Sequence, residues 1–133
     1  MRPDTPAQDA FHATFFRVPI GVAIAITDVR GRFLECNPAY CDMLGYTQAE
    51  LQTMDSVAVT HPDDRTLNRE LLGRLMRREV PNFVMEKRYI TKAGAIVWSR
   101  IHVSITADDS ELPGCLLGVA EDITEKRQAE LQL

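Results

Sequence analysis

Five stretches of the chain have the hydrophobic pattern of strands: two are continuously apolar, and the others follow the spacing of strands. This spacing is typical of β-strands that bury one face. Residues 28–31 and 92–94 have the composition of turns, and each separates two neighbouring stretches. The predicted strands are residues 22–27, 32–36, 83–91, 96–106 and 116–120.

Residues 37–51 have helix start and stop signals instead of strand spacing. Asn37 and Pro38 predict a helix start, because asparagine caps free N–H groups and proline suits the first helical position. Gly45 ends this helix. Thr47 and Glu50 have the spacing of a capping box, so a second short helix is expected directly afterwards.

Three further helices are predicted. A longer one covers residues 64–78, with Asp63 as its cap. Its expected inward residues are Leu67, Leu71, Leu72, Leu75 and Met76. A C-terminal helix follows the capping-box pattern of residues 122–125. Near the N-terminus, one helical stripe holds Ala10, Phe11, Thr14, Phe15 and Val18.

The order of elements is one helix, two strands, three short helices, three strands and a last helix. A pair of strands, a helical block and a three-stranded meander predict an α+β fold, with one antiparallel sheet and helices on one face. A length of 133 residues suits one domain. The expected division is a linker remnant at 1–10, the domain at 11–122 and an outgoing helix at 123–133.

Composition excludes several classes of protein. Hydrophobic residues make up 45% and charged residues 26%, which argues against a disordered chain. The net charge is −4 and no dense basic block occurs, which argues against nucleic-acid binding. The longest apolar run, residues 18–26, is too short for membrane insertion. Three cysteines without a CxxC pair, and no signal-peptide pattern, predict a cytoplasmic protein with free thiols.

Short motifs stand in order at the joints of these elements. They are PIGV at 19–22, DVRGRFL at 28–34, NPAYCDMLGY at 37–46 followed by EL at 50–51, HPDD at 61–64, KAGAIVW at 92–98 and DITEKR at 122–127. Together they resemble a PAS domain with its C-terminal PAC segment, over about residues 11–127.

The resemblance implies a five-stranded antiparallel sheet in the order 2-1-5-4-3, with short helices on one face and a flanking helix at each end. It also implies a cytoplasmic sensory module of a larger bacterial signalling protein. The output domain of such proteins is typically a histidine kinase, a cyclic-di-GMP enzyme or a chemotaxis-type transducer. No such region is present in this chain, so the output domain is expected elsewhere in the full-length protein.

The sequence argues against catalysis and against common PAS cofactors. Its histidines, His12, His61 and His102, have no metal-ligand spacing, so no metal site is expected. Haem-binding relatives usually supply a histidine from the long helix or the helix before it, and His61 belongs to the ordinary HPDD motif of the family. Flavin-binding relatives carry a reactive cysteine where this chain has residues 60–65. No nucleophile with a base or paired catalytic carboxylates stands out, so no enzymatic activity is expected.

A cavity between the sheet and the helices is the expected ligand site, by strand alternation and by resemblance. The lining candidates are Ala25, Thr27, Leu34, Cys36, Tyr40, Leu44, Leu72, Met76, Met85, Ile101, Val103 and Leu117. Nearly all are apolar, which favours a small apolar ligand such as a fatty-acid-like chain. The alternative is that these residues fill a dry core.

The flanking helices are the other candidate site. Phe11, Phe15, Val18 and Ile123 are candidates for a homodimer contact, as flanking helices of the family pair across a two-fold axis. Asp122 and Thr124 would hold the joint between the last strand and the C-terminal helix. The favoured hypothesis is a sensor that relays ligand occupancy through this helix. The alternatives are a ligand-free dimerisation scaffold and a haem or redox sensor.

Overall fold

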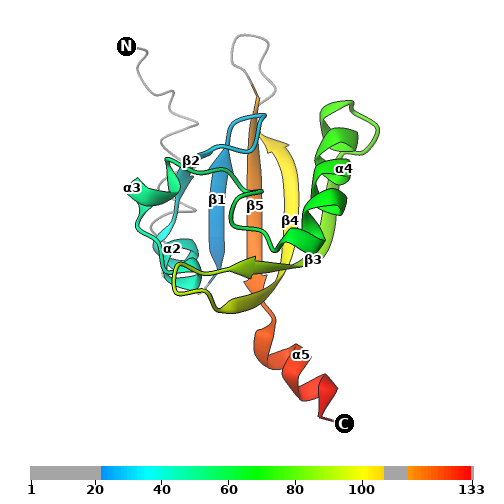
Figure 1. Cartoon of the computed structure of the whole chain (residues 1–133). Helices are drawn as coiled ribbons and strands as arrows, with labels where there is room; N and C mark the ends of the chain where they lie inside the picture. The colour runs from blue at the N-terminus through cyan, green and yellow to red at the C-terminus, as the bar shows by residue number, and fades with distance from the viewer. Residues whose placement is uncertain (1–21, 107–113, 133) are drawn as a thin grey trace.

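One antiparallel sheet forms the centre of the computed structural model, which describes residues 22–106 and 114–132 (Figure 1). The strand order is β2-β1-β5-β4-β3, as expected from the resemblance. The strands are β1 (Ala23–Thr27), β2 (Phe33–Cys36), β3 (Asn82–Ile90), β4 (Ile96–Thr106) and β5 (Cys115–Asp122). The predicted α+β fold is therefore confirmed, and each strand end lies within two residues of its predicted position.

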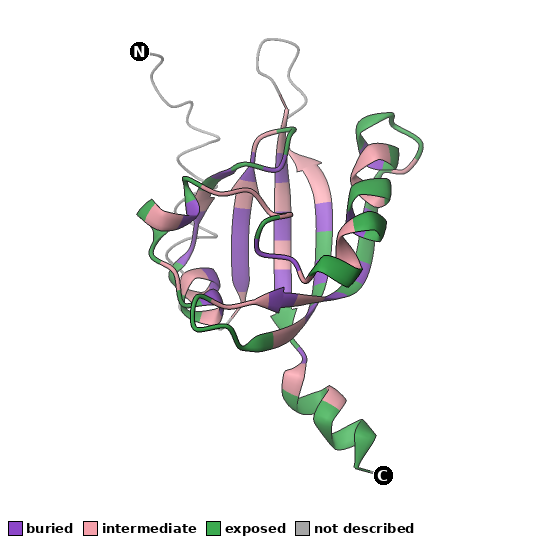
Figure 2. Cartoon of the chain, in the orientation of Figure 1, coloured by how far each residue is buried: buried purple, intermediate pink, exposed green. Residues whose placement is uncertain are grey.

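Short helices cover one face of the sheet, and a last helix leaves it. The helical elements are α2 (Pro38–Leu44), α3 (Gln48–Leu51), the 3₁₀ turn η1 (Pro62–Asp64), α4 (Arg65–Met76) and α5 (Thr124–Leu131). Helix α5 follows β5 and extends away from the sheet, with most of its surface exposed (Figure 2). Within the described residues, no helix is both long and apolar enough to cross a membrane.

Local capping places the first helices as the sequence predicts. The Asn37 side chain accepts hydrogen bonds from the backbone N–H of Tyr40 and of Ile24, and so joins α2 to β1. Thr47 and Glu50 form the expected capping box. The prediction of Asp63 as the cap of the long helix was wrong. His61 Nδ1 instead accepts from the Asp63 N–H, because a 3₁₀ turn precedes α4.

A register shift in the β1–β2 pair changes which side of β2 faces the helices. Thr27 pairs with Phe33, whereas Ile26 pairs with Glu35, so Leu34 is an extra residue in the ladder. Phe33 and Cys36 are buried as a result, and Leu34 is 41% exposed. Simple alternation had placed Leu34 and Cys36 on the same inner face, which is wrong for Leu34.

Two glycines in different backbone conformations are expected to respond to alanine substitution with opposite changes in stability. Gly45 ends α2 with a φ of 79°, in the left-handed region where a side chain is strained, whereas Gly73 lies inside α4. A Cβ on Gly73 would meet only the movable end of Arg77 at 3.0 Å. We expect Gly45→Ala to lower the free energy of unfolding by about 1 kcal/mol and Gly73→Ala to raise it by up to about 1 kcal/mol. Urea unfolding of both variants checks the opposite signs, and two changes of the same sign would contradict the assignment.

Candidate functional site

A buried lysine distinguishes the interior of this domain from an ordinary apolar core. Lys87 lies on β3, where Phe83, Met85, Lys87 and Tyr89 are buried and alternate with exposed or half-buried residues. Only 1% of Lys87 is exposed. The sequence interpretation missed this residue, although the same alternation that placed Met85 inward also placed Lys87 inward.

Neutral oxygen atoms hold the Lys87 ammonium group. Lys87 Nζ donates to Thr60 Oγ1 and to Asn68 Oδ1, each at 3.0 Å. Thr60 comes from the segment before η1, and Asn68 is one of the two buried residues of α4. The ammonium also lies 4.8 Å from the centre of the Tyr89 ring, a cation–π distance. The cluster therefore joins β3, α4 and the segment that precedes η1.

Burial sets the electrostatics of this cluster. Loss of hydration lowers the pKa of Lys87 from 10.5 to about 7, while the negative charge of Asp64 acts in the opposite direction. Asp64 does not contact Lys87 directly, because its carboxylate accepts three hydrogen bonds from Arg88, at 2.8, 2.9 and 3.1 Å. These bonds also lower the pKa of Asp64. Lys87 is thus a cation without a contacting carboxylate partner among the described residues.

Two tyrosines continue the polar cluster into the core. Tyr40 donates to the hydroxyl oxygen of Tyr89 at 3.3 Å, and their rings meet edge to face. Burial raises the pKa of both hydroxyls, so both stay neutral near pH 7. The Tyr40 hydroxyl, expected as a polar contact for a ligand, already forms a hydrogen bond with Tyr89 within the protein.

Most of the predicted lining residues come together in one core. The buried ones are Ala25, Thr27, Cys36, Tyr40, Leu44, Met85, Ile101 and Val103, and Leu72 packs beside them partly buried. These side chains pack against one another, so their burial alone does not show whether a ligand binds there.

Three lining candidates lie elsewhere. Leu34 is turned outward by the register shift, as described above. Met76, at the end of α4, is 37% exposed, because the neighbouring Leu75 occupies the buried position. Leu117 pairs with Ile26 and Ser104 on the other face of the sheet, and Leu116 takes the inner position instead.

The joint between β5 and α5 has the predicted polar contacts. Asp122 Oδ1 accepts from the Thr124 N–H at 2.9 Å, and Thr124 Oγ1 accepts from the Trp98 N–H at 3.0 Å. Ile123 is 5% exposed, so its side chain is buried within this chain instead of being free for a dimer contact. The other dimer candidates, Phe11, Phe15 and Val18, and the linker at 1–10, lie outside the described residues.

Arginine side chains fix α5 against the outer face of the sheet. The guanidinium carbon of Arg127 lies 3.7 Å from the centre of the Trp98 indole, and Arg127 Nη1 donates to Glu86 Oε1 at 2.8 Å. Arg88 lies over the same indole at 5.2 Å. Glu86, Lys87 and Arg88 are consecutive on β3, so one short segment contacts both the interior cluster and α5.

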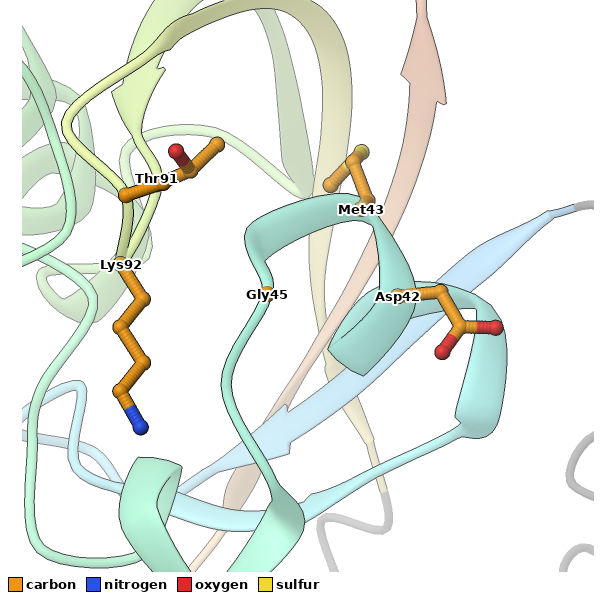
Figure 3. A pocket seen from close by; sticks show the side chains of 6 residues that line it. Asp42, Met43, Gly45, Thr91 and Lys92 are labelled. Atoms are coloured by element: carbon orange, nitrogen blue, oxygen red, sulfur yellow. The ribbon is translucent and has the colours of Figure 1, made fainter.

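An open surface pocket of about 390 Å³ lies between the end of α2 and the β3–β4 turn (Figure 3). Asp42 points away from it, and Lys92 extends toward α3, where its ammonium bonds Glu50 at 2.6 Å. Both charged groups of the lining are therefore directed elsewhere, which makes this pocket a weaker candidate site than the Lys87 cluster.

The thiols and possible metal ligands are the other reactive groups of the domain. Cys36, Cys41 and Cys115 form no disulfide bond. Burial raises the pKa of Cys36 to about 12, which keeps it protonated and unreactive at neutral pH. Within residues 22–106 and 114–132, no three histidine, cysteine or acidic side chains are grouped to hold a metal ion.

Sequence comparisons find much longer curated proteins that contain a similar segment. The chain is 33% identical over 107 residues to the sensor histidine kinase TmoS of Ectopseudomonas mendocina, covering 80% of this chain and 11% of that protein. It is 30% identical over 109 residues to the probable diguanylate cyclase DgcE of Escherichia coli K12, covering 82% of this chain and 10% of that protein. The chain thus spans about one-tenth of the length of these curated relatives.

Structural comparison agrees with these matches. A domain of a sensory box sensor histidine kinase/response regulator from Geobacter sulfurreducens superposes with a TM-score of 0.71 and 25% identity, covering 87% of this chain and 94% of that chain. The PAS domain of a Colwellia psychrerythraea protein gives 0.72 at 20% identity, covering 92% and 99%. The family model described as the PAS fold matches residues 33–120. With this match across most of the chain, the protein belongs to the PAS fold family.

Proposed function

We propose that this chain is the sensory module of a larger signal-transduction protein, and that changes around Lys87 are passed along β3 to α5. Its relatives include a sensor histidine kinase and a probable diguanylate cyclase, each about ten times longer than the matched region. On this proposal the chain has no catalytic activity of its own and biases an output domain. Its free thiols fit a reducing compartment such as the cytoplasm.

The observation that carries the proposal is the arrangement of contacts along residues 86–89. Lys87 and Tyr89 face the interior, whereas Glu86 and Arg88 contact the outer groups Arg127 and Trp98. Arg88 also binds Asp64, next to α4. A shift of β3 caused by an interior ligand would therefore alter the contacts that hold α5. Such a ligand must bind the two arrangements with unequal affinity.

A chimeric protein tests this relay. The matching domain of DgcE is replaced by this chain, joined within α5 with the helical register kept, and cyclic-di-GMP formation is measured. We expect Arg127→Ala to change the rate by about fivefold or more, because it removes both the Trp98 contact and the Glu86 ion pair. Lys126→Ala is the matched control, since Lys126 is exposed on the same helix turn.

The result is interpreted with the melting temperature of each isolated domain. If Arg127→Ala folds normally and has the same output as the Lys126→Ala control, the proposed relay is wrong. A change confined to Arg127→Ala supports it.

A dimerisation scaffold is the second proposal, supported by one feature of α5. Leu131 is 84% exposed on a helix that extends away from the domain (Figure 1). An exposed leucine at this place suits packing against a second helix, for example from another copy of the chain. The two proposals are compatible, since a relay through paired helices needs both.

A further inference from the structure

The Lys87 cluster contains buried polar atoms that have no hydrogen-bond partner among the described residues. An ammonium group has three N–H donors, and two of them are used by Thr60 and Asn68. Asn68 Nδ2 and Ser99 Oγ are buried and have no hydrogen-bond partner among the described residues. Asn68 is 3% exposed and Ser99 is 0% exposed. Unpartnered donors at such depth are rare, because each loses its hydration without compensation.

These donors belong to one place in the fold. Asn68 accepts from Lys87 Nζ through its carbonyl oxygen, and its unpartnered nitrogen belongs to the same side-chain amide. Ser99 is the direct cross-strand partner of Lys87 in the β3–β4 ladder, so both side chains project from the same face of the sheet. The next pair on this face, Met85 with Ile101, is apolar and buried.

Within the part of the chain that the structure describes, the surrounding ionisable groups place no negative charge in contact with the ammonium. They are His61, Asp63 and Asp64 before α4, Arg65 on α4, Tyr89 on β3, Tyr40 and Cys36 beside them, and Asp122 at the end of β5. Asp64 is bonded to Arg88, and Asp122 accepts from the Thr124 N–H. Asp63 is largely exposed, and Arg65 Nε donates to the Thr60 carbonyl oxygen. The tyrosine and cysteine side chains stay neutral because burial raises the pKa of each.

Building on the sensory function proposed above, we propose that the Lys87 cluster binds the carboxylate of a small organic acid with a short apolar chain. The carboxylate oxygens accept from Lys87 Nζ, Asn68 Nδ2 and Ser99 Oγ. A negative charge at this point compensates the buried ammonium, which a neutral acceptor does not do. The apolar chain of the ligand lies against Met85 and Ile101. The ligand thus keeps the apolar character expected from the sequence, with a carboxylate at one end.

On this proposal a ligand reaches the site past helix α4, since Lys87, Asn68 and Ser99 are each 3% exposed or less. The helix covers the cluster through Asn68, and its buried residues are Asn68 and Leu75. Leu71 and Leu72 are only partly buried. Binding therefore requires an outward shift of α4, and the same shift would act on Arg88 through Asp64 at the start of the helix.

Calorimetric titration of the chain with straight-chain monocarboxylates of increasing length, in carboxylate-free buffer, tests the proposal. We expect binding by the acids, and affinity lower by about tenfold or more for the primary alcohol of equal length. Lys87→Met should weaken acid binding by about tenfold or more, and Ser99→Ala should weaken it less. Lys92→Met is the matched control for loss of a lysine charge, and it should bind like the unchanged chain.

A second readout does not depend on any variant. Free Lys87 is mostly neutral at pH 8, so binding a carboxylate should take up on the order of one proton per site. Titrations in two buffers with different ionisation enthalpies measure this uptake. Equal binding of acid and alcohol, acid binding without proton uptake, or no binding of any acid would each overturn the carboxylate site. The chimera assay for Arg127 is performed without ligand, so its failure would instead contradict the relay.

Discussion

Replacing Leu75 with alanine is expected to lower the free energy of unfolding by about 3 kcal/mol. Leu75 is 0% exposed and is the only apolar residue of α4 that is fully buried among the described residues. Truncation of the Leu75 side chain leaves a cavity beneath α4, which also carries Asn68. The packing of α4 over the Lys87 cluster should therefore loosen as stability falls. Urea unfolding and amide exchange of α4 measure the two effects.

Leu67→Ala is the matched control on the same helix. The expectation that Leu67 faces inward was wrong, because it is 49% exposed, so its truncation should change the free energy of unfolding by no more than about 0.5 kcal/mol. Helix propensity changes equally in both variants, since each replaces leucine by alanine in α4. Equal losses in the two variants would mean that α4 is packed through a different face.

Raising the pH from 6 to 8.5 is expected to stabilise the fold by about 2 kcal/mol through Lys87 alone. The pKa of Lys87 is about 7 in the folded chain and near 10.5 once it is exposed by unfolding. Above pH 7 the unfolded chain therefore holds more protons at this residue than the folded chain, and stability rises with pH. Below pH 7 both states are protonated and the contribution becomes flat.

Thiol ionisation limits the useful pH range. Burial raises the pKa of Cys36, so ionisation of the unfolded thiol reduces stability at higher pH and opposes the effect of Lys87. Urea unfolding at several pH values up to 8.5, in carboxylate-free buffer, measures the slope. The rise in stability with pH should be lost in Lys87→Met, which leaves only the opposite effect of the thiols, and it should persist in Lys92→Met. A slope that is the same in both variants would show that Lys87 does not cause it.

Periodicity and turn chemistry were sufficient to predict the five strands and the α-helices of the described residues, but not the 3₁₀ turn η1. The capping box at Thr47 and Glu50, and the helix start at Asn37, act within a few residues and formed as predicted. The motifs at these joints identified the PAS family, which supplied the strand order that the chain adopts. Local signals of this kind succeed because the interacting atoms are neighbours along the chain.

The sequence predicted only in part which side chains are buried on the inner face of the sheet. Alternation correctly placed Met85, Ile101 and Val103 on the inner face, but a one-residue shift turned Leu34 outward. Leu117 was assigned to the wrong face, since nothing local distinguishes it from Leu116. These errors arise because alternation gives relative orientation along a strand, whereas absolute orientation depends on the pairing of separate strands.

The sequence by itself determined the elements, the family and the apolar character of the core. Only the tertiary structure revealed the buried cation with its unpartnered donors, because Thr60, Asn68 and Ser99 reach Lys87 from three separate segments. The shifted pKa of Lys87 has the same origin. Desolvation depends on how completely distant parts of the chain exclude water from a group, and no spacing along the sequence records that.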